Sequence, residues 1–95
     1  MKYPHFKVIK PIIAEAFLSN KYIQSLKIEN LEKDLDFEIT GIAQNLFEED
    51  IENTKLQKQL SIWFSVSYPE KKWNSDQFIE TVSEIKEKLK KIENV

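Results

Sequence analysis

The chain has 95 residues, 41% of them hydrophobic and 12% aromatic, which is enough for one packed core and predicts a single α+β domain spanning residues 1–95. All 14 basic residues are lysine, the 16 acids bring the formal net charge to −2, and cysteine is absent. This composition excludes disulfides and thiolate metal sites. No apolar run approaches the roughly 20 residues that cross a bilayer, so we expect a cytoplasmic protein without a membrane partner.

The first predicted element is a short helix over residues 11–19. Proline is well tolerated in the first turn of a helix, which is where Pro11 would lie. The expected buried side consists of Ile12, Ile13, Ala16 and Phe17. Residues 6–10, which come before this helix, are either a strand or an extension imposed by the following proline.

Two short runs with a period of two follow and predict a β-hairpin. Apolar side chains alternate with polar ones over residues 22–29 and again over residues 35–40, which is the pattern of strands with one buried face. Residues 32–34 would form the turn between them. Gly41, the only glycine, falls where the second run changes phase, and this predicts a β-bulge.

The clearest strand pattern covers residues 60–68. Serines and Trp63 alternate there with a set of residues that would face the core, namely Leu60, Ile62, Phe64, Val66 and Tyr68. The preceding segment, residues 45–58, is either a long hairpin loop or a short helix.

Residues 75–92 predict a long amphipathic helix. Asn74 or Ser75 can cap its first turn, and lysines near its end oppose the negative pole of the helix dipole. Its apolar stripe, widened by Ile79, recurs at steps of three and four residues and consists of Phe78, Val82, Ile85, Leu89 and Ile92.

These elements combine into the order αβββα. A short N-terminal helix would be followed by a three-stranded antiparallel sheet, with the long C-terminal amphipathic helix packed on one face of the sheet. If residues 45–58 are helical and residues 6–10 form a strand, the order becomes that of a ferredoxin-like variant with an extra C-terminal helix.

The sequence offers few groups for catalysis or for cofactor binding. His5 is the only histidine and lies near the N-terminus, which disfavours both a serine–histidine–acid arrangement and a histidine zinc site. A single glycine rules out the glycine-rich loops that bind nucleotide phosphates. We therefore expect no enzyme, no catalytic residue, no cofactor and no metal site.

Negative charge is concentrated in the middle of the chain. Residues 29–52 contain nine acids and one lysine, a local formal charge of −8. Such a surface attracts a basic partner and repels nucleic acid, so direct nucleic-acid binding is not expected. Trp63, placed among small polar residues, is the expected apolar anchor. The predicted partner-binding residues are thus Trp63 and the nine acids Glu29, Glu32, Asp34, Asp36, Glu38, Glu48, Glu49, Asp50 and Glu52.

Together these features predict a non-enzymatic protein-binding module that engages a basic, nucleic-acid-handling protein through its acidic segment. Small size and residue usage typical of AT-rich coding suit an inhibitor, an antitoxin or immunity protein, or a phage anti-defence protein. One alternative is a self-associating structural subunit, a homodimer that buries either the Trp63 face or the apolar stripe of the C-terminal helix. Another is an RNA-binding domain, because the αβββα order with Lys71 and Lys72 before the last helix is similar to that of double-stranded-RNA-binding domains.

Overall fold

The computed structural model describes residues 6–48 and 51–93, with the side chains of residues 7–46 and 51–92, and every regular element in this part of the chain is helical. The elements in chain order are α1 (Phe6–Leu18), α2 (Lys21–Gln24), α3 (Leu31–Asp34), α4 (Asp36–Glu48), α5 (Asn53–Ser67), the 3-10 turn η1 (Ser75–Phe78) and α6 (Ile79–Glu93). The predicted αβββα fold is therefore wrong, and so is the ferredoxin-like alternative. The domain is small, as expected, but it is all-helical and not α+β.

The segment predicted as the best strand, residues 60–68, forms most of α5. Leu56, Leu60 and Phe64 follow one another at steps of four, and each is at most 1% exposed. Ile62 and Val66, which the strand pattern assigned to the buried side, are 53% and 75% exposed. The segment carries both a period of two and a period of four. The helical period prevails because Leu56 extends the buried stripe upstream of the predicted strand and most of the flanking residues favour a helix.

The predicted hairpin is replaced by short helices and by α4. Leu35, Ile39, Ile42 and Leu46 recur at steps of four, three and four, and each is at most 2% exposed. The change of phase that predicted a β-bulge at Gly41 is therefore the normal alternation of a helical stripe, and the bulge is wrong. The alternation of apolar and polar residues over residues 22–29 and 35–40 is short, and so short a pattern is also compatible with helices.

Residues 22–29 do not form a strand but contain α2 and an irregular connector that leads to α3. Lys27 in this connector has a φ of 53°, a left-handed conformation that is uncommon for residues other than glycine. The predicted turn at residues 32–34 is part of α3, where the Asn30 side chain accepts a hydrogen bond from the Lys33 backbone N–H at 3.2 Å.

The predicted N-terminal helix exists but begins earlier than expected. α1 starts at Phe6, so Pro11 lies inside the helix and residues 6–10 are neither a strand nor an extension. Proline has no backbone N–H, so Pro11 cannot donate the hydrogen bond that a regular helix makes to the residue four positions earlier. Ile13, Ala16 and Phe17 are fully buried, in agreement with the expected core side of this helix.

The long C-terminal helix is confirmed. It consists of η1 and α6, and its predicted stripe is buried at Phe78, Val82, Ile85 and Leu89. The first turn is capped at Asn74, whose backbone N–H donates to Gln77 Oε1 at 3.0 Å. Ile79 was expected to widen the buried stripe, but it is 48% exposed, so that part of the prediction is wrong.

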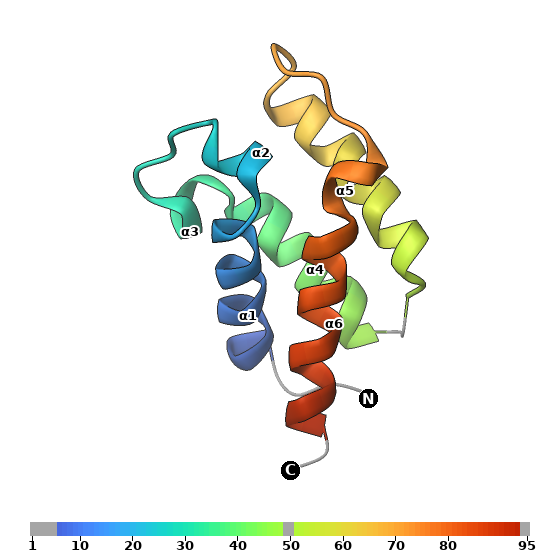
Figure 1. Ribbon diagram of the computed structural model, residues 1–95. Helices are drawn as coiled ribbons and strands as arrows, with labels where there is room; N and C mark the ends of the chain where they lie inside the picture. Colours follow the sequence, from blue (N-terminus) through green and yellow to red (C-terminus); the bar gives the residue numbers. More distant parts are fainter. Residues whose placement is uncertain (1–5, 49–50, 94–95) are drawn as a thin grey trace.

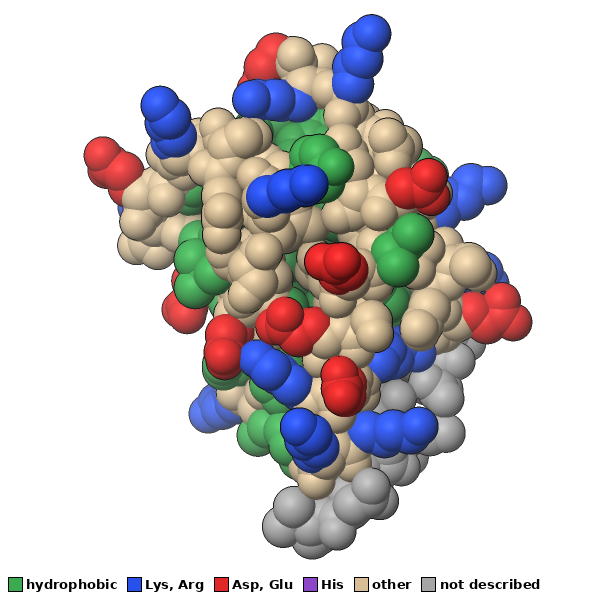
Figure 2. All heavy atoms as spheres, viewed as in Figure 1, with side chains coloured by type: hydrophobic (Ala, Val, Ile, Leu, Met, Phe, Trp, Pro, Cys, Tyr) green, Lys and Arg blue, Asp and Glu red, His purple; other side chains and the backbone are tan. Residues whose placement is uncertain are grey.

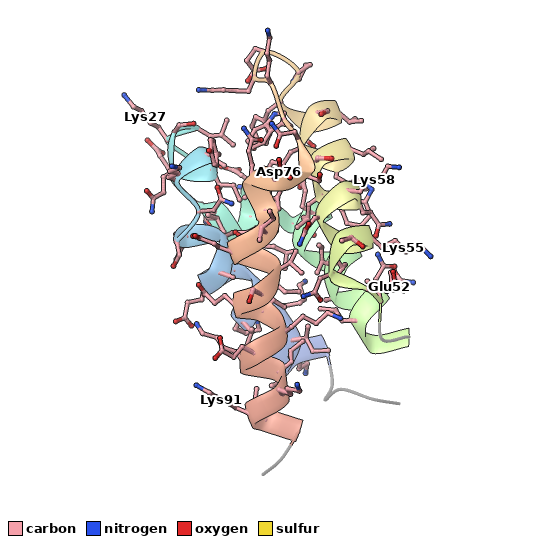
Figure 3. All side chains as sticks on the ribbon, turned by 45° about the vertical axis from the view of Figure 1, so that its right-hand side comes forward. Lys27, Glu52, Lys55, Lys58, Asp76 and Lys91 are labelled. Carbon is pink, nitrogen blue, oxygen red and sulfur yellow. The ribbon has the colours of Figure 1, made fainter. Side chains whose placement is uncertain are left out.

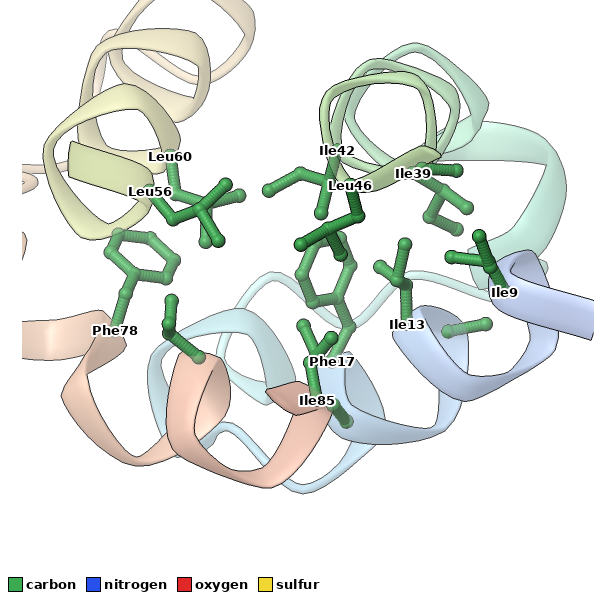
Figure 4. Packing of buried hydrophobic residues seen from close by; sticks show 14 of the residues in the cluster. Ile9, Ile13, Phe17, Ile39, Ile42, Leu46, Leu56, Leu60, Phe78 and Ile85 are labelled. Atoms are coloured by element: carbon green, nitrogen blue, oxygen red, sulfur yellow. The ribbon is translucent and has the colours of Figure 1, made fainter. Parts of the chain in front are cut away.

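The helices enclose one hydrophobic cluster. Figure 1 shows α1 and α6 side by side, with α4 behind them and α5 beside η1 and α6. Figure 4 shows how apolar side chains from α1, α4, α5, η1 and α6 point toward one another between the helices. At one end of the core, the rings of Phe64, Trp73 and Phe78 lie 4.9 to 5.9 Å apart. Trp73 thus closes this end of the core.

Asn20 connects the N-terminal helices to α6. Its side-chain amide donates to the Gln77 carbonyl and to Thr81 Oγ1, each at 2.9 Å. Its side-chain oxygen accepts from the backbone N–H groups of Tyr22 and Ile23, which caps α2. The residue is only 6% exposed, so all of these bonds form away from bulk water.

Candidate functional site

Three pairs of residues join α4 to α5. The two helices are antiparallel at this seam, so the partners follow one another in opposite order along the two helices. Ser67 Oγ donates to Glu38 Oε1 at 2.6 Å, and Asn45 Nδ2 donates to Gln59 Oε1 at 2.8 Å. Between these two polar pairs, the ring of Trp63 lies on Gly41. The two helices are therefore joined at a largely polar seam whose central contact is one indole ring.

Gly41 allows this ring to approach the backbone of α4. A Cβ atom added at Gly41 would lie 2.6 Å from Trp63 Cη2 and 2.8 Å from Cζ3, closer than real Cβ atoms come to their neighbours. Trp63 is half-buried here, and its ring also meets Phe37 edge-on with the ring centroids 5.9 Å apart. The indole is thus partly covered by α4 and by the Phe37 ring.

Exposed apolar residues of α4 and α5 extend outward from Trp63, and together with it they form what we call the α4–α5 face. It consists of Phe37, Ile62, Trp63 and Val66. Phe37 meets the indole ring, Val66 lies one turn from Trp63 on α5, and Ile62 lies one turn from Val66. Phe37 is 66% exposed, while Ile62 and Val66 lie one helical turn apart on α5 and are 53% and 75% exposed. Aromatic and branched side chains exposed next to one another in this way are characteristic of interaction surfaces.

Sequence reasoning missed three of these four residues. Phe37, Ile62 and Val66 were assigned to the buried side of a sheet, and only Trp63 was singled out as a contact residue. A signal was present in the sequence, because Leu56, Leu60 and Phe64 define a helical stripe on α5 that leaves Ile62 and Val66 outside it.

Negative charge gathers at one end of the α4–α5 face. Tyr68 follows the last turn of α5, and its pKa is raised above the ordinary value of 10.0, first by burial and then by the carboxylates of Glu38, Asp34 and Glu70. Toward the other end of α5, Glu52, Lys55 and Lys58 lie along its outer side (Figure 3). Three carboxylates thus lie near Tyr68 at the end of α5, with Lys71 and Lys72 next to Glu70 in the chain, and charges of both signs lie near the start of α5.

The raised pKa of Tyr68 predicts a loss of stability at high pH. The unfolded chain ionises this phenol first, so stability is fully present below about pH 10 and falls as the pH rises through the folded-state pKa. We expect the stability difference between the wild type and Tyr68→Phe to shrink as the pH rises above 10, measured by urea unfolding at several pH values. A difference that is independent of pH would contradict this assignment. Glu38→Gln should lower the Tyr68 pKa only in part, because burial is the larger cause.

Glu38 is not available for direct contact. It is 1% exposed, and its Oε2 atom has no hydrogen-bond partner among the described residues, although Oε1 accepts from Ser67. The strand pattern had placed this carboxylate on a solvated face. A buried acid with one unpaired oxygen normally destabilises a fold, so α4 and α5 meet here at some cost in stability.

The remaining predicted acids do not form one patch. Glu29 and Glu32 line a groove between α1 and α3, whereas Asp36 pairs with Lys10 of α1 at 3.3 Å. Asp34 is exposed near Tyr68, and Glu52 is exposed at the start of α5. The side chain of Glu48 and the residues Glu49 and Asp50 lie outside the described part of the chain. Figure 2 shows acidic and basic side chains interleaved on the face formed by α1 and α6.

Within the described ranges, no three His, Cys, Asp or Glu side chains are grouped so that they could hold a metal ion. No helix in those ranges is both long enough and apolar enough to cross a membrane. The chain matches no protein-family model, and comparisons with curated proteins and with solved structures give no match either.

Proposed function

We propose that this protein is a non-enzymatic binding module that uses the α4–α5 face to dock on a protein partner with a basic surface. The observation that supports this most directly is the exposure of Phe37, Ile62 and Val66 on the face that contains the half-buried Trp63. Aromatic residues surrounded by other apolar side chains are the usual energetic centres of protein interfaces. Burying this face would remove most of the large exposed apolar side chains of α4 and α5 from water.

The charge at the edge of the face favours a basic partner. Asp34 and Glu70 act on Tyr68 at the end of the face that carries Phe37 and Val66. Lysine or arginine side chains on a partner would meet these carboxylates at the rim, which speeds association and sets the orientation of docking. In this proposal the protein acts in the cytoplasm by covering a basic, nucleic-acid-handling surface, as an inhibitor, an antitoxin, an immunity protein or an anti-defence protein does.

The proposal is tested by capture from a lysate of the organism that encodes the chain, with captured proteins quantified by mass spectrometry. Phe37→Ser/Val66→Ser should reduce capture of the specific partner by about tenfold or more, since truncated hot-spot residues cost at least about 2 kcal/mol. Val8→Ser/Ile79→Ser is the matched control, because these residues are also exposed, at 42% and 48%, but lie on α1 and α6. Equal losses in both variants, or a captured partner without a basic surface, would contradict the proposal.

A second copy of the chain is the alternative partner for the same face. Lys55 and Lys58 lie on the outer side of α5 toward its start, and Asp34 and Glu70 lie near its end, so two α5 helices packed antiparallel would bring opposite charges together. Light scattering over a range of protein concentrations distinguishes self-association from binding of a different partner. A mass that stays that of a monomer excludes self-association and leaves the basic partner as the candidate.

A further inference from the structure

A second surface lies between the outer side of α1 and the segment that joins α2 to α3. It is a groove with a volume of about 520 Å³. One wall is formed by Pro11, Ala14, Glu15 and Leu18, which follow one another at successive turns of α1. The opposite wall is formed by residues 28–32. We call this feature the α1–α3 groove.

The floor of the α1–α3 groove is apolar. Ala14 is 4% exposed at its base, while Ile28 and Leu31 are half-buried on the opposite wall. Leu18 is 57% exposed at one end of the groove. An apolar side chain laid along this floor would be removed from water at about 25 cal/mol for each Å² that it buries.

The rim of the same groove is acidic on both walls. Glu15 stands on the α1 wall, Glu29 and Glu32 stand on the other, and no lysine is among the described residues that line it. Glu15 already has a partner, because Lys88 Nζ lies 3.0 Å from its Oε1 atom. Glu29 and Glu32 are exposed and form no ion pair with any described residue. Lys7 and Lys10 line an adjoining hollow that shares Pro11, Ala14 and Glu32 with the groove, so the excess of acid is confined to the wall of Glu29 and Glu32.

We propose that the α1–α3 groove binds a short basic peptide segment in which an apolar side chain is flanked by lysine or arginine. The apolar floor favours an apolar side chain, and Glu29 and Glu32 on one wall favour cations beside it, whereas Glu15 on the other wall is already paired with Lys88. Nucleic acid fits neither requirement, because its phosphates would be repelled by the rim. A small cation would satisfy the rim but would leave the floor exposed.

This site is separate from the proposed partner-binding face. Figure 1 places α1 and α3 on one side of the molecule and α5 on the other, with α4 between them. No residue of the α4–α5 face lines the groove. A failure of either proposal therefore leaves the other intact.

The probe for this site is a blocked pentapeptide with leucine at its centre and lysine at the four other positions, titrated into the ¹⁵N-labelled full chain. The expected result is saturable shifts that cluster at the amides of Ala14, Leu18, Ile28 and Leu31. Replacing the leucine of the probe by serine should weaken binding about tenfold, a loss of about 1.4 kcal/mol that corresponds to removing one buried aliphatic side chain. Free lysine amide should bind more weakly still.

Charge reversal tests the rim independently of the floor. Glu29→Lys/Glu32→Lys should raise the dissociation constant of the probe about tenfold or more, because like charges then face it on one wall. The control Glu52→Lys/Glu80→Lys changes the net charge by the same amount at exposed positions outside the groove. It should change the dissociation constant of the probe less than about threefold. Leu18→Ser provides a second variant at a solvent-exposed position, and it should weaken the leucine probe without affecting the serine probe.

Three results would overturn the proposal. Equal affinity for the leucine and serine probes would mean general attraction of cations, and equal affinity for free lysine amide would mean a small-cation site. Shifts centred on Phe37, Trp63 and Val66 would assign the peptide to the α4–α5 face. Circular dichroism of each variant confirms that its helices are intact before the constants are compared.

Discussion

Replacing Asn20 by alanine is expected to lower the free energy of unfolding by about 3 kcal/mol. Through its amide, the side chain donates one hydrogen bond to η1 and one to α6, and its oxygen accepts two more at the start of α2. Alanine leaves the Thr81 hydroxyl, which is only 4% exposed, without this donor, and it removes the cap of α2 at the same time. Urea denaturation followed by circular dichroism measures the change, which is a large part of the roughly 5–15 kcal/mol typical of a domain.

Asn30→Ala is the matched control for this prediction. Asn30 caps α3 in the same way, with a single hydrogen bond to the Lys33 N–H, but it is exposed and makes no described contact with α6. Its loss should cost about 1 kcal/mol or less. The loss of unfolding free energy in Asn20→Asp should lie between those of Asn20→Ala and Asn30→Ala, because aspartate keeps the cap of α2 but cannot donate to the Gln77 carbonyl. If Asn20→Ala were no more destabilising than Asn30→Ala, the connection to α6 would contribute nothing.

Replacing Gly41 by alanine is expected to destabilise the protein by about 1 kcal/mol, although the same change inside a helix usually stabilises by a similar amount. The reason is Trp63, whose ring would lie 2.6 Å from the new methyl group and must move outward. In a Trp73→Phe background, the remaining indole should then show red-shifted fluorescence, because it is more exposed to water. Urea unfolding measures the stability in the same samples.

The Gly41 prediction is separated from helix propensity by a second background. With Trp63→Leu already in place, the obstructing ring is gone, so Gly41→Ala should raise the stability by about 0.5–1 kcal/mol. The change of sign between the two backgrounds is the signature of the contact. A gain of stability in the presence of Trp63 would show that the ring yields without cost, and the α4–α5 face would then be less rigid than an interface anchor requires.

The two surfaces give the protein separate chemistry on opposite sides of α4. The α4–α5 face is apolar with a negative end, and its centre is held by the contact between Gly41 and Trp63. The α1–α3 groove is narrow and has acids on both walls. A folded partner suits the first and an extended basic segment suits the second, so one partner with a basic tail is able to use both.

The elements that could be predicted from the sequence are those fixed by local signals. The helix over residues 75–92 has a cap at Asn74 and four buried positions at helical spacing, all within one segment, and it is present as predicted. The helix around Pro11 was also predicted, although its start was placed too late because proline was assumed to lie in the first turn. Local signals therefore identified both helices correctly, but not the start of α1.

The strands failed because their patterns were ambiguous. Over residues 60–68, apolar residues occupy every second position, so the segment satisfies a strand and a helix equally. What decides between them is which positions find apolar partners on other elements. Leu56, Leu60 and Phe64 are buried where α5 packs against η1 and α6. Ile62 and Val66 have no such partner helix and stay exposed. That information belongs to the packing of distant segments and is absent from the local pattern.

The acidic residues were expected to act together because they are close in sequence. In a helix, successive residues point about 100° apart, so neighbours in the chain are distributed around the axis. Asp36 forms an ion pair with Lys10 of α1, and Glu38 is buried and accepts a hydrogen bond from Ser67. Phe37, between them in the chain, is exposed and contacts Trp63. Three consecutive residues have three different environments, which a strand would not have produced.

By itself, the sequence determined the scarcity of reactive groups, the excess of acids in the middle of the chain and the C-terminal helix, because composition and local periodicity require no knowledge of the fold. Only the tertiary structure decided that Phe37, Ile62 and Val66 stay exposed on the face that contains Trp63, and that Glu29 and Glu32 line a groove on α1. The physical reason is that burial is shared between helices. An apolar side chain stays on the surface only when no other helix covers it, and an acid meets a groove only when a distant element forms the other wall.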